Sequence, residues 1–152
     1  MTRGRAVIAA TTLVALVATS AALAAPTTNV RYFGGVPGDS EAKVRLTTAQ
    51  TEDGDTKVVK RFRFKKVTGV CDGVVQRITL KTTGRVPVDA ETRFFKRAFG
   101  SKTGPLVRVE GTVSKTGQRI VGAFNAKRIV IDGLGTCKVP TQAFKVKNFV
   151  VG

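Results

Sequence analysis

The chain has 152 residues, with 26 lysines and arginines against ten aspartates and glutamates, and a net charge of +16. This length suits one domain with a sizeable buried core. The chain contains no histidine, which excludes serine–histidine–aspartate sites, cysteine–histidine sites and histidine-bound metals. We therefore expect a protein that is not an enzyme and that holds neither a metal nor a cofactor.

Residues 1–24 are predicted to be a secretory signal peptide. Two arginines precede an uncharged, largely apolar stretch that ends in Ala-Leu-Ala, which matches the A-x-A pattern of signal-peptidase sites. We expect cleavage after Ala24 and secretion of residues 25–152 as a single domain without a transmembrane segment. The alternative is that the leader is retained as a membrane anchor. The mature domain keeps a net charge of +14, because the leader carries two of the basic residues and none of the acidic ones.

The remainder of the chain predicts β-strands from end to end. Apolar and polar residues alternate with a period of two, as in Arg61-Phe62-Arg63-Phe64-Lys65, and Gly- and Asp-rich turns separate the runs. We expect about eight strands, at residues 29–34, 42–49, 56–67, 74–83, 91–99, 106–113, 118–131 and 142–151. Such a series predicts an antiparallel β-sandwich, with a small closed β-barrel as the alternative.

The alternation also predicts which side chains form the core. The expected members are the apolar residues on one face of each strand: Val44, Leu46, Val58, Phe62, Phe64, Ile78, Leu80, Val107, Val109, Val113, Ile120, Phe124, Ile129, Ile131, Phe144 and Val146.

Cys71 and Cys137 are the two cysteines of the chain. An even number of cysteines in an exported protein predicts a disulfide, here closing a loop of about 65 residues. The chain has no C-x-x-C motif, so a redox-active pair is not expected.

Three patterns hint at chemistry and are more simply explained as turns. Ser40-Glu41-Ala42-Lys43 matches S-x-x-K, but it follows a Pro-Gly-Asp turn rather than opening a helix. Asp53-Gly54-Asp55 resembles the start of a calcium loop whose later ligand positions are unfilled. Asp72 and Asp132 each lie near a cysteine and could form a catalytic carboxylate pair, although Asp-Gly is also an ordinary turn sequence.

The densest basic run predicts a candidate polyanion-binding surface. On a strand, Arg61, Arg63 and Lys65 share one face, spaced about 6.6–6.8 Å apart. Such a row could follow the anions of a polymer, and its alternative role is that of a solvated face. No aromatic side chain shares that face of the strand, so specific nucleic-acid binding by base stacking is not expected.

A set of short motifs resembles a loose group of small exported proteins, uncharacterised in function, from high-GC Gram-positive bacteria. The resemblance covers about residues 30–147 and implies a secreted β-sandwich without catalytic residues. It rests on Tyr32-Phe33-Gly34, Phe62-Arg63-Phe64, Cys71-Asp72-Gly73, Phe95, Val109-Glu110-Gly111-Thr112-Val113, Gly122-Ala123-Phe124 and Gly135-Thr136-Cys137.

Together these features predict a secreted, basic, monomeric β-domain that acts as a binding or structural module of the cell envelope or medium. An anionic envelope polymer or a membrane surface is the expected partner, because a strongly positive protein attracts such polyanions. The alternatives are a barrel that carries an apolar ligand and a secreted inhibitor.

Overall fold

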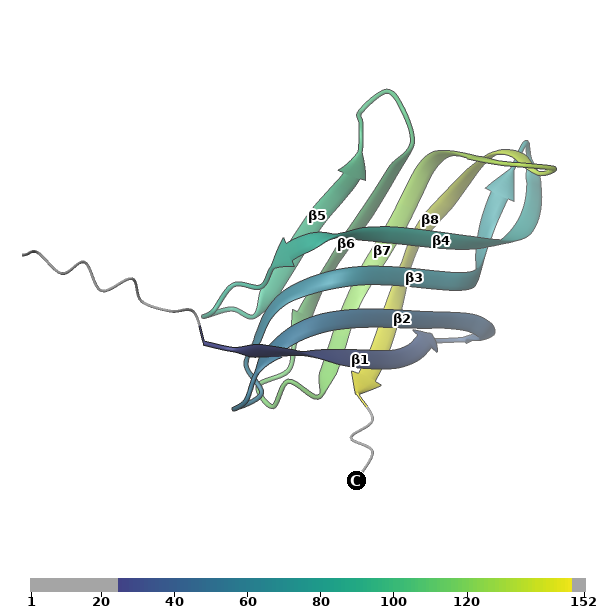
Figure 1. Ribbon diagram of the computed structural model, residues 1–152. Helices are drawn as coiled ribbons and strands as arrows, with labels where there is room; N and C mark the ends of the chain where they lie inside the picture. The colour runs from purple at the N-terminus through teal and green to yellow at the C-terminus, as the bar shows by residue number, and fades with distance from the viewer. Residues whose placement is uncertain (1–24, 149–152) are drawn as a thin grey trace, which may run out of the picture.

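The computed structural model describes residues 25–148, which fold into eight antiparallel β-strands (Figure 1). The all-β prediction and the expected number of strands are thus confirmed. The strands are β1 (Thr27–Val36), β2 (Asp39–Thr51), β3 (Thr56–Cys71), β4 (Val74–Pro87), β5 (Phe94–Gly100), β6 (Leu106–Val113), β7 (Arg119–Ile131) and β8 (Gly135–Asn148). The predicted leader and the end of the predicted eighth strand lie outside the described residues. Within residues 25–148, no helix has the length and apolar character needed to cross a membrane.

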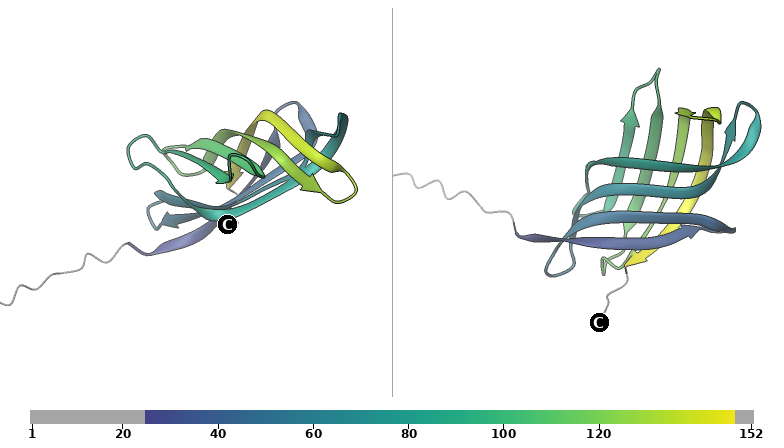
Figure 2. Two further views of the ribbon diagram at one scale, coloured as in Figure 1. Left: turned by 90° about the horizontal axis from the view of Figure 1, so that it is seen from above. Right: turned by 45° about the vertical axis from the view of Figure 1, so that its right-hand side comes forward.

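The strands form two layers that cross each other (Figures 1 and 2). Strands β1–β4 make the front layer and β5–β8 the back layer, as Figure 1 shows them. Both belong to one sheet with the order β4-β3-β2-β1-β8-β7-β6-β5. The layers meet at two corners, where β8 pairs with β1 and with β3. Strands β4 and β5 are the two ends of this order, so the fold is a sandwich made from one bent sheet rather than the closed barrel.

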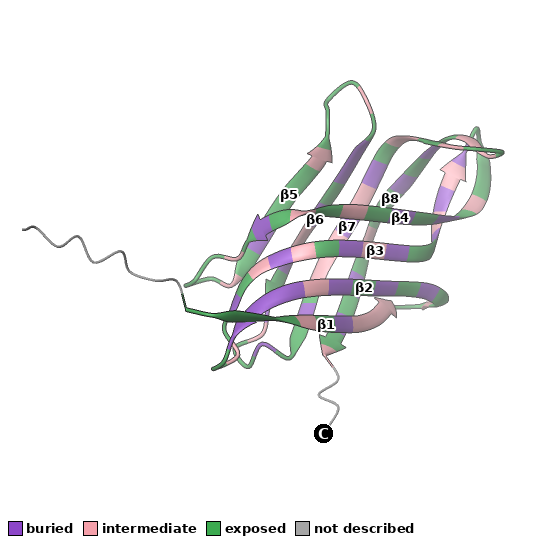
Figure 3. Cartoon of the chain, in the orientation of Figure 1, coloured by how far each residue is buried: buried purple, intermediate pink, exposed green. Residues whose placement is uncertain are grey.

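The core lies between the layers, where alternate residues of each strand are buried (Figure 3). Its centre is aromatic. The rings of Phe64 on β3 and Phe124 on β7 stack with their centroids 4.0 Å apart, and Phe144 meets Phe64 edge-on at 5.8 Å. Phe62 contacts Phe99 of β5 in the same way at 5.7 Å. These contacts join the two layers, and the large side chains between the layers fill their interior.

Most of the predicted core residues are buried, but three are not. Val58 was expected in the core, yet its neighbour Val59 takes that place. The cause is a β-bulge: the register of β3 shifts around Lys60 against both β2 and β4, and one extra residue exchanges the two faces of a strand. Ile129 and Ile131 are half-buried at the edge of the core.

The predicted disulfide is present. Cys71 and Cys137 are bonded to each other, lie directly opposite one another on β3 and β8, and are both buried. The bond therefore closes the second corner of the sandwich, where the front layer meets the back layer.

Candidate polyanion-binding face

The structure places Arg61, Arg63 and Lys65 on the outer side of β3, away from the core. Phe62 and Phe64, which alternate with them, are buried. Arg61 and Lys65 are exposed and Arg63 is half-buried. The sequence thus assigned these three side chains to the correct side of the strand.

Neighbouring strands add further cations to the same surface, because residues opposite each other in a sheet project to the same side. Lys43 lies opposite Lys65, and Arg45 lies opposite Arg63. Arg63 in turn lies opposite Lys81. We define the front face as the outer surface of β1–β4 that carries seven cations: Arg31, Lys43, Arg45, Arg61, Arg63, Lys65 and Lys81.

The front face contains three directly opposed pairs of like charge: Lys43 with Lys65, Arg45 with Arg63, and Arg63 with Lys81. Like charges directly opposite one another destabilise a sheet. Among the described residues, none of the seven cations forms an ion pair with a carboxylate. Counterions or a bound anion would therefore reduce the repulsion between these cations.

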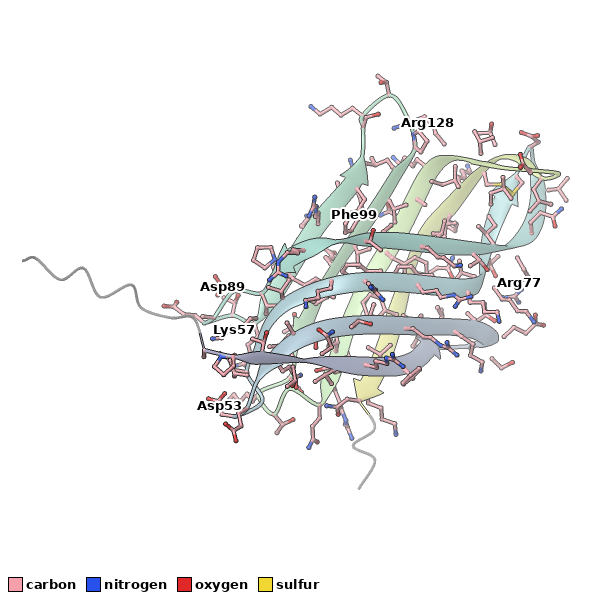
Figure 4. All side chains as sticks on the ribbon, in the orientation of Figure 1. Asp53, Lys57, Arg77, Asp89, Phe99 and Arg128 are labelled. Carbon is pink, nitrogen blue, oxygen red and sulfur yellow. A yellow bond between two sulfur atoms is a disulfide. The ribbon has the colours of Figure 1, made fainter. Side chains whose placement is uncertain are left out.

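The carboxylates lie at the margins of the front layer. Arg77 contacts Asp39 at 2.5 Å and Glu41 at 3.7 Å, measured between nitrogen and oxygen. At the opposite end, Lys57 pairs with Asp55 in the turn between β2 and β3. Figure 4 shows Arg77 at one end of the layer, and Asp53 and Lys57 at the other. The centre of the front face is therefore positive and its two ends are closer to neutral.

The front face also has a depression of about 370 Å³. Its walls are long side chains, among them Arg31, Arg45, Arg61, Arg63 and Lys81. The short side chains of Thr47 and Thr83, which both lie opposite Arg61, also belong to its lining.

Two further features of this depression are the polar side chain of Arg63 and the aromatic ring of Phe33. The Nε atom of Arg63 is buried and has no hydrogen-bond partner among the described residues. The guanidinium of Arg45 lies 5.4 Å from the ring centroid of Phe33 on β1, a cation–π distance. The arginines therefore line a positive hollow, and the residues around it include Arg63, whose buried Nε donor is unsatisfied.

The sequence did not reveal the participation of Arg31, Arg45 and Lys81, because strand pairing rather than spacing along the chain brings them beside Arg61 and Arg63. It also missed a buried polar cluster that joins β1 and β2 to the turn between β6 and β7. There Tyr32 donates to the carbonyl oxygen of Gly117, and Gln50 donates to the hydroxyl groups of Tyr32 and Thr56. Burial raises the pKa of Tyr32. These groups satisfy one another, so this cluster serves the fold.

The other candidate residues act as turn residues. Asp53 accepts a hydrogen bond from the Thr51 hydroxyl within its own turn. Within the described part of the chain, no three His, Cys, Asp or Glu residues group closely enough to hold a metal ion. Ser40 and Lys43 both lie on β2, where Lys43 donates from Nζ to the backbone oxygen of Ser40 at 3.1 Å. The S-x-x-K match therefore does not form the helical motif found in penicillin-recognising enzymes.

Asp72 is held in a turn beside the disulfide. It has a φ of 47°, and its carboxylate lies against Gly135, where an added Cβ would be only 1.9 Å from Oδ2. Gly135 also has a φ of +85°. Both this backbone conformation and the closeness of the Asp72 carboxylate therefore favour glycine at this position. Asp132 lies in the turn between β7 and β8. Both aspartates are therefore turn residues, as their Asp-Gly sequences predict.

Comparison of the chain with protein-family models, with curated proteins and with solved structures yields no match.

Proposed function

We propose that this protein is a secreted, non-catalytic module that binds an anionic polymer of the cell envelope or the surrounding medium through its front face. The observation that carries the proposal is the set of opposed cations on neighbouring strands, with no carboxylate paired to any of them among the described residues. A polyanion would replace this repulsion with attraction and release its own counterions.

The distribution of charge supports binding over simple solubility. Strands β1, β3, β4, β5, β7 and β8 contain no aspartate or glutamate, and most of the carboxylates lie in turns. A surface that serves solubility alone is best built with both signs interspersed. Here the positive charges are concentrated on the sheet and the negative charges lie around it.

The filled interior favours this function over that of an apolar-ligand carrier. Phe62, Phe64, Phe124 and Phe144 are each about 1% exposed or less. A carrier needs a cavity between its walls, whereas these rings occupy the space between the layers. The buried disulfide is compatible with an exported protein.

The salt dependence of binding tests the proposal. Heparin and purified teichoic acid are titrated against the domain at several salt concentrations, and the slope of log affinity against log salt concentration is compared with that of Arg61→Gln/Arg63→Gln. The slope should become shallower by about two in the double variant, because each lost contact removes roughly one released counterion.

Lys127→Gln/Lys138→Gln is the matched control. It removes the same charge from exposed positions on β7 and β8 of the back layer, and its slope should stay close to that of the wild type. The proposal fails if the front-face variant and the control behave alike, or if neither polymer binds at low salt.

A further inference from the structure

The row of cations on the front face continues past its edge onto the back layer. Within the front layer, the row runs from Lys81 to Arg63, Arg45 and Phe33. Because β1 also pairs with β8, Phe33 lies opposite Lys147. The row therefore does not end at β1, as it would in a sandwich of two separate sheets.

Lys147 then lies opposite Arg119 on β7. Both side chains are exposed, and both alternate with buried neighbours, Val146 and Ile120. They therefore project to the outside of the back layer. One row of side chains thus passes across six strands, from β4 to β7.

A second row runs beside the first around the same corner. Lys65 lies opposite Lys43, which lies opposite Gly35. Gly35 in turn lies opposite Lys145 of β8. We define the belt as the residues of these two rows: Lys81, Arg63, Arg45, Phe33, Lys147, Arg119, Lys65, Lys43, Gly35 and Lys145.

The length and shape of the belt restrict the kinds of ligand that can contact all of it. Neighbouring strands lie about 4.7–4.9 Å apart, so the first row covers roughly 24 Å across six strands. It starts on the front layer, turns the corner formed by β1 and β8, and ends on the back layer. Figure 1 shows these layers crossing one behind the other. A flat bilayer can touch only one side of such a corner, whereas a flexible chain can follow it.

We infer that the ligand is a linear, flexible polyanion, such as an anionic polysaccharide of the envelope, which crosses the strands and wraps around the corner between the layers. This inference rests on the proposed function and adds to it the course of the polymer and the role of Arg119, Lys145 and Lys147. Phe33 lies midway along the first row and offers an apolar contact for the backbone of the polymer.

Heparin oligosaccharides of two lengths test the course of the polymer. A disaccharide is much shorter than the belt and can occupy the front face alone, whereas a decasaccharide is long enough to reach the back layer. The test variant is Arg119→Gln/Lys147→Gln, at the far end of the belt. Lys127→Gln/Lys138→Gln again serves as the control, with equal charge removed from the same two strands outside the belt.

We expect the far-end variant to bind the decasaccharide about tenfold more weakly than the control does, with a salt slope shallower by about two. Its affinity for the disaccharide should match that of the control. Arg61→Gln/Arg63→Gln should weaken the binding of both oligosaccharides. Thermal unfolding of each variant shows that the comparison is made between folded proteins.

Two results would overturn the inference, and the first of them would leave the proposed function intact. In one, the far-end variant and the control bind the decasaccharide with equal affinity, while the front-face variant binds it more weakly. In the other, the protein binds tightly to vesicles of anionic lipid, and only the front-face variant loses this binding. The decasaccharide then also binds no more tightly than the disaccharide. If the front-face variant also binds both oligosaccharides normally, the proposed function itself is refuted.

Discussion

Cys71 on β3 and Cys137 on β8 lie opposite each other at the corner where the front and back layers meet, and a disulfide joins them. The ladder between these two strands is short, since the paired residues are Val70 with Lys138 and Cys71 with Cys137. The disulfide therefore contributes much of the connection between the layers at this corner. The other corner, between β1 and β8, is held by a longer ladder.

Removal of this disulfide should destabilise the domain without changing its fold. The bond joins residues 66 positions apart, and the chain-entropy relation assigns about 4 kcal/mol to a loop of that size. Cys71→Ala/Cys137→Ala should therefore lower the free energy of unfolding by up to about 4 kcal/mol, measured by denaturation in urea. Reduction of the wild type should give a similar loss. An unchanged unfolding midpoint in both experiments would show that the ladders and the core alone hold the corner.

The loop between β4 and β5 depends on one carboxylate. The Oδ1 atom of Asp89 accepts hydrogen bonds from the backbone N–H groups of Glu91 and Thr92, at 2.9 and 2.8 Å, and from the Thr92 hydroxyl at 3.0 Å. The hydrogen bonds from Thr92, followed by that from Glu91, lower the pKa of Asp89. This loop sets the direction in which the chain leaves the front layer, and Figure 4 shows Asp89 beside it.

Asp89 should therefore contribute to stability in a pH-dependent way. A carboxyl group whose pKa is lower in the folded state stabilises that state above its unfolded pKa of about 3.9, and the contribution is lost as the pH falls through the folded pKa. Asp89→Asn should reduce stability at neutral pH and lessen its decline in acid, as measured by thermal unfolding between neutral and strongly acidic pH. Glu91→Gln is the control. A parallel decline in Asp89→Asn and the wild type would assign the acid sensitivity to other groups.

The alternation of side chains explains why the fold was largely predictable and the binding surface was not. A period of two identifies the inner and outer faces of each strand, so Phe62, Phe64 and Arg63 were assigned correctly. It fails where a bulge intervenes, as at Lys60, because Val58 and Val59 are both apolar and the alternation does not show which of them faces the core. The assembly of Arg31, Arg45 and Lys81 around Arg63, and its extension to Lys147, depends on which strands pair and in which register, and that information is absent from local sequence.

Tyr32 is fully buried and links three parts of the domain. It lies on β1, its hydroxyl accepts a hydrogen bond from Gln50 of β2, and it donates to the carbonyl oxygen of Gly117 between β6 and β7. Burial is the largest cause of its raised pKa. The folded protein should therefore keep Tyr32 neutral beyond the pH at which a free tyrosine ionises.

The chain allows this ionisation to be measured without interference, because it contains one tyrosine and no tryptophan. Tyrosinate absorbance should appear near pH 10 in the denatured protein and at a higher pH in the folded protein. A group with a raised folded pKa stabilises the protein below its unfolded pKa, and that contribution is lost as the pH rises through the folded pKa. Wild-type stability should consequently fall more steeply above pH 10 than that of Tyr32→Phe.

At neutral pH, Tyr32→Phe should cost about 1–3 kcal/mol, because the carbonyl of Gly117 and the amide of Gln50 each lose a buried partner. Urea unfolding of the two proteins at neutral pH measures this difference. Since Gln50 also donates to Gly117 at 2.9 Å, the loss should lie toward the lower end of that range. Normal ionisation of Tyr32 in the folded state, together with an unchanged stability of Tyr32→Phe, would mean that solvent reaches the hydroxyl and that the cluster does not hold the two layers together.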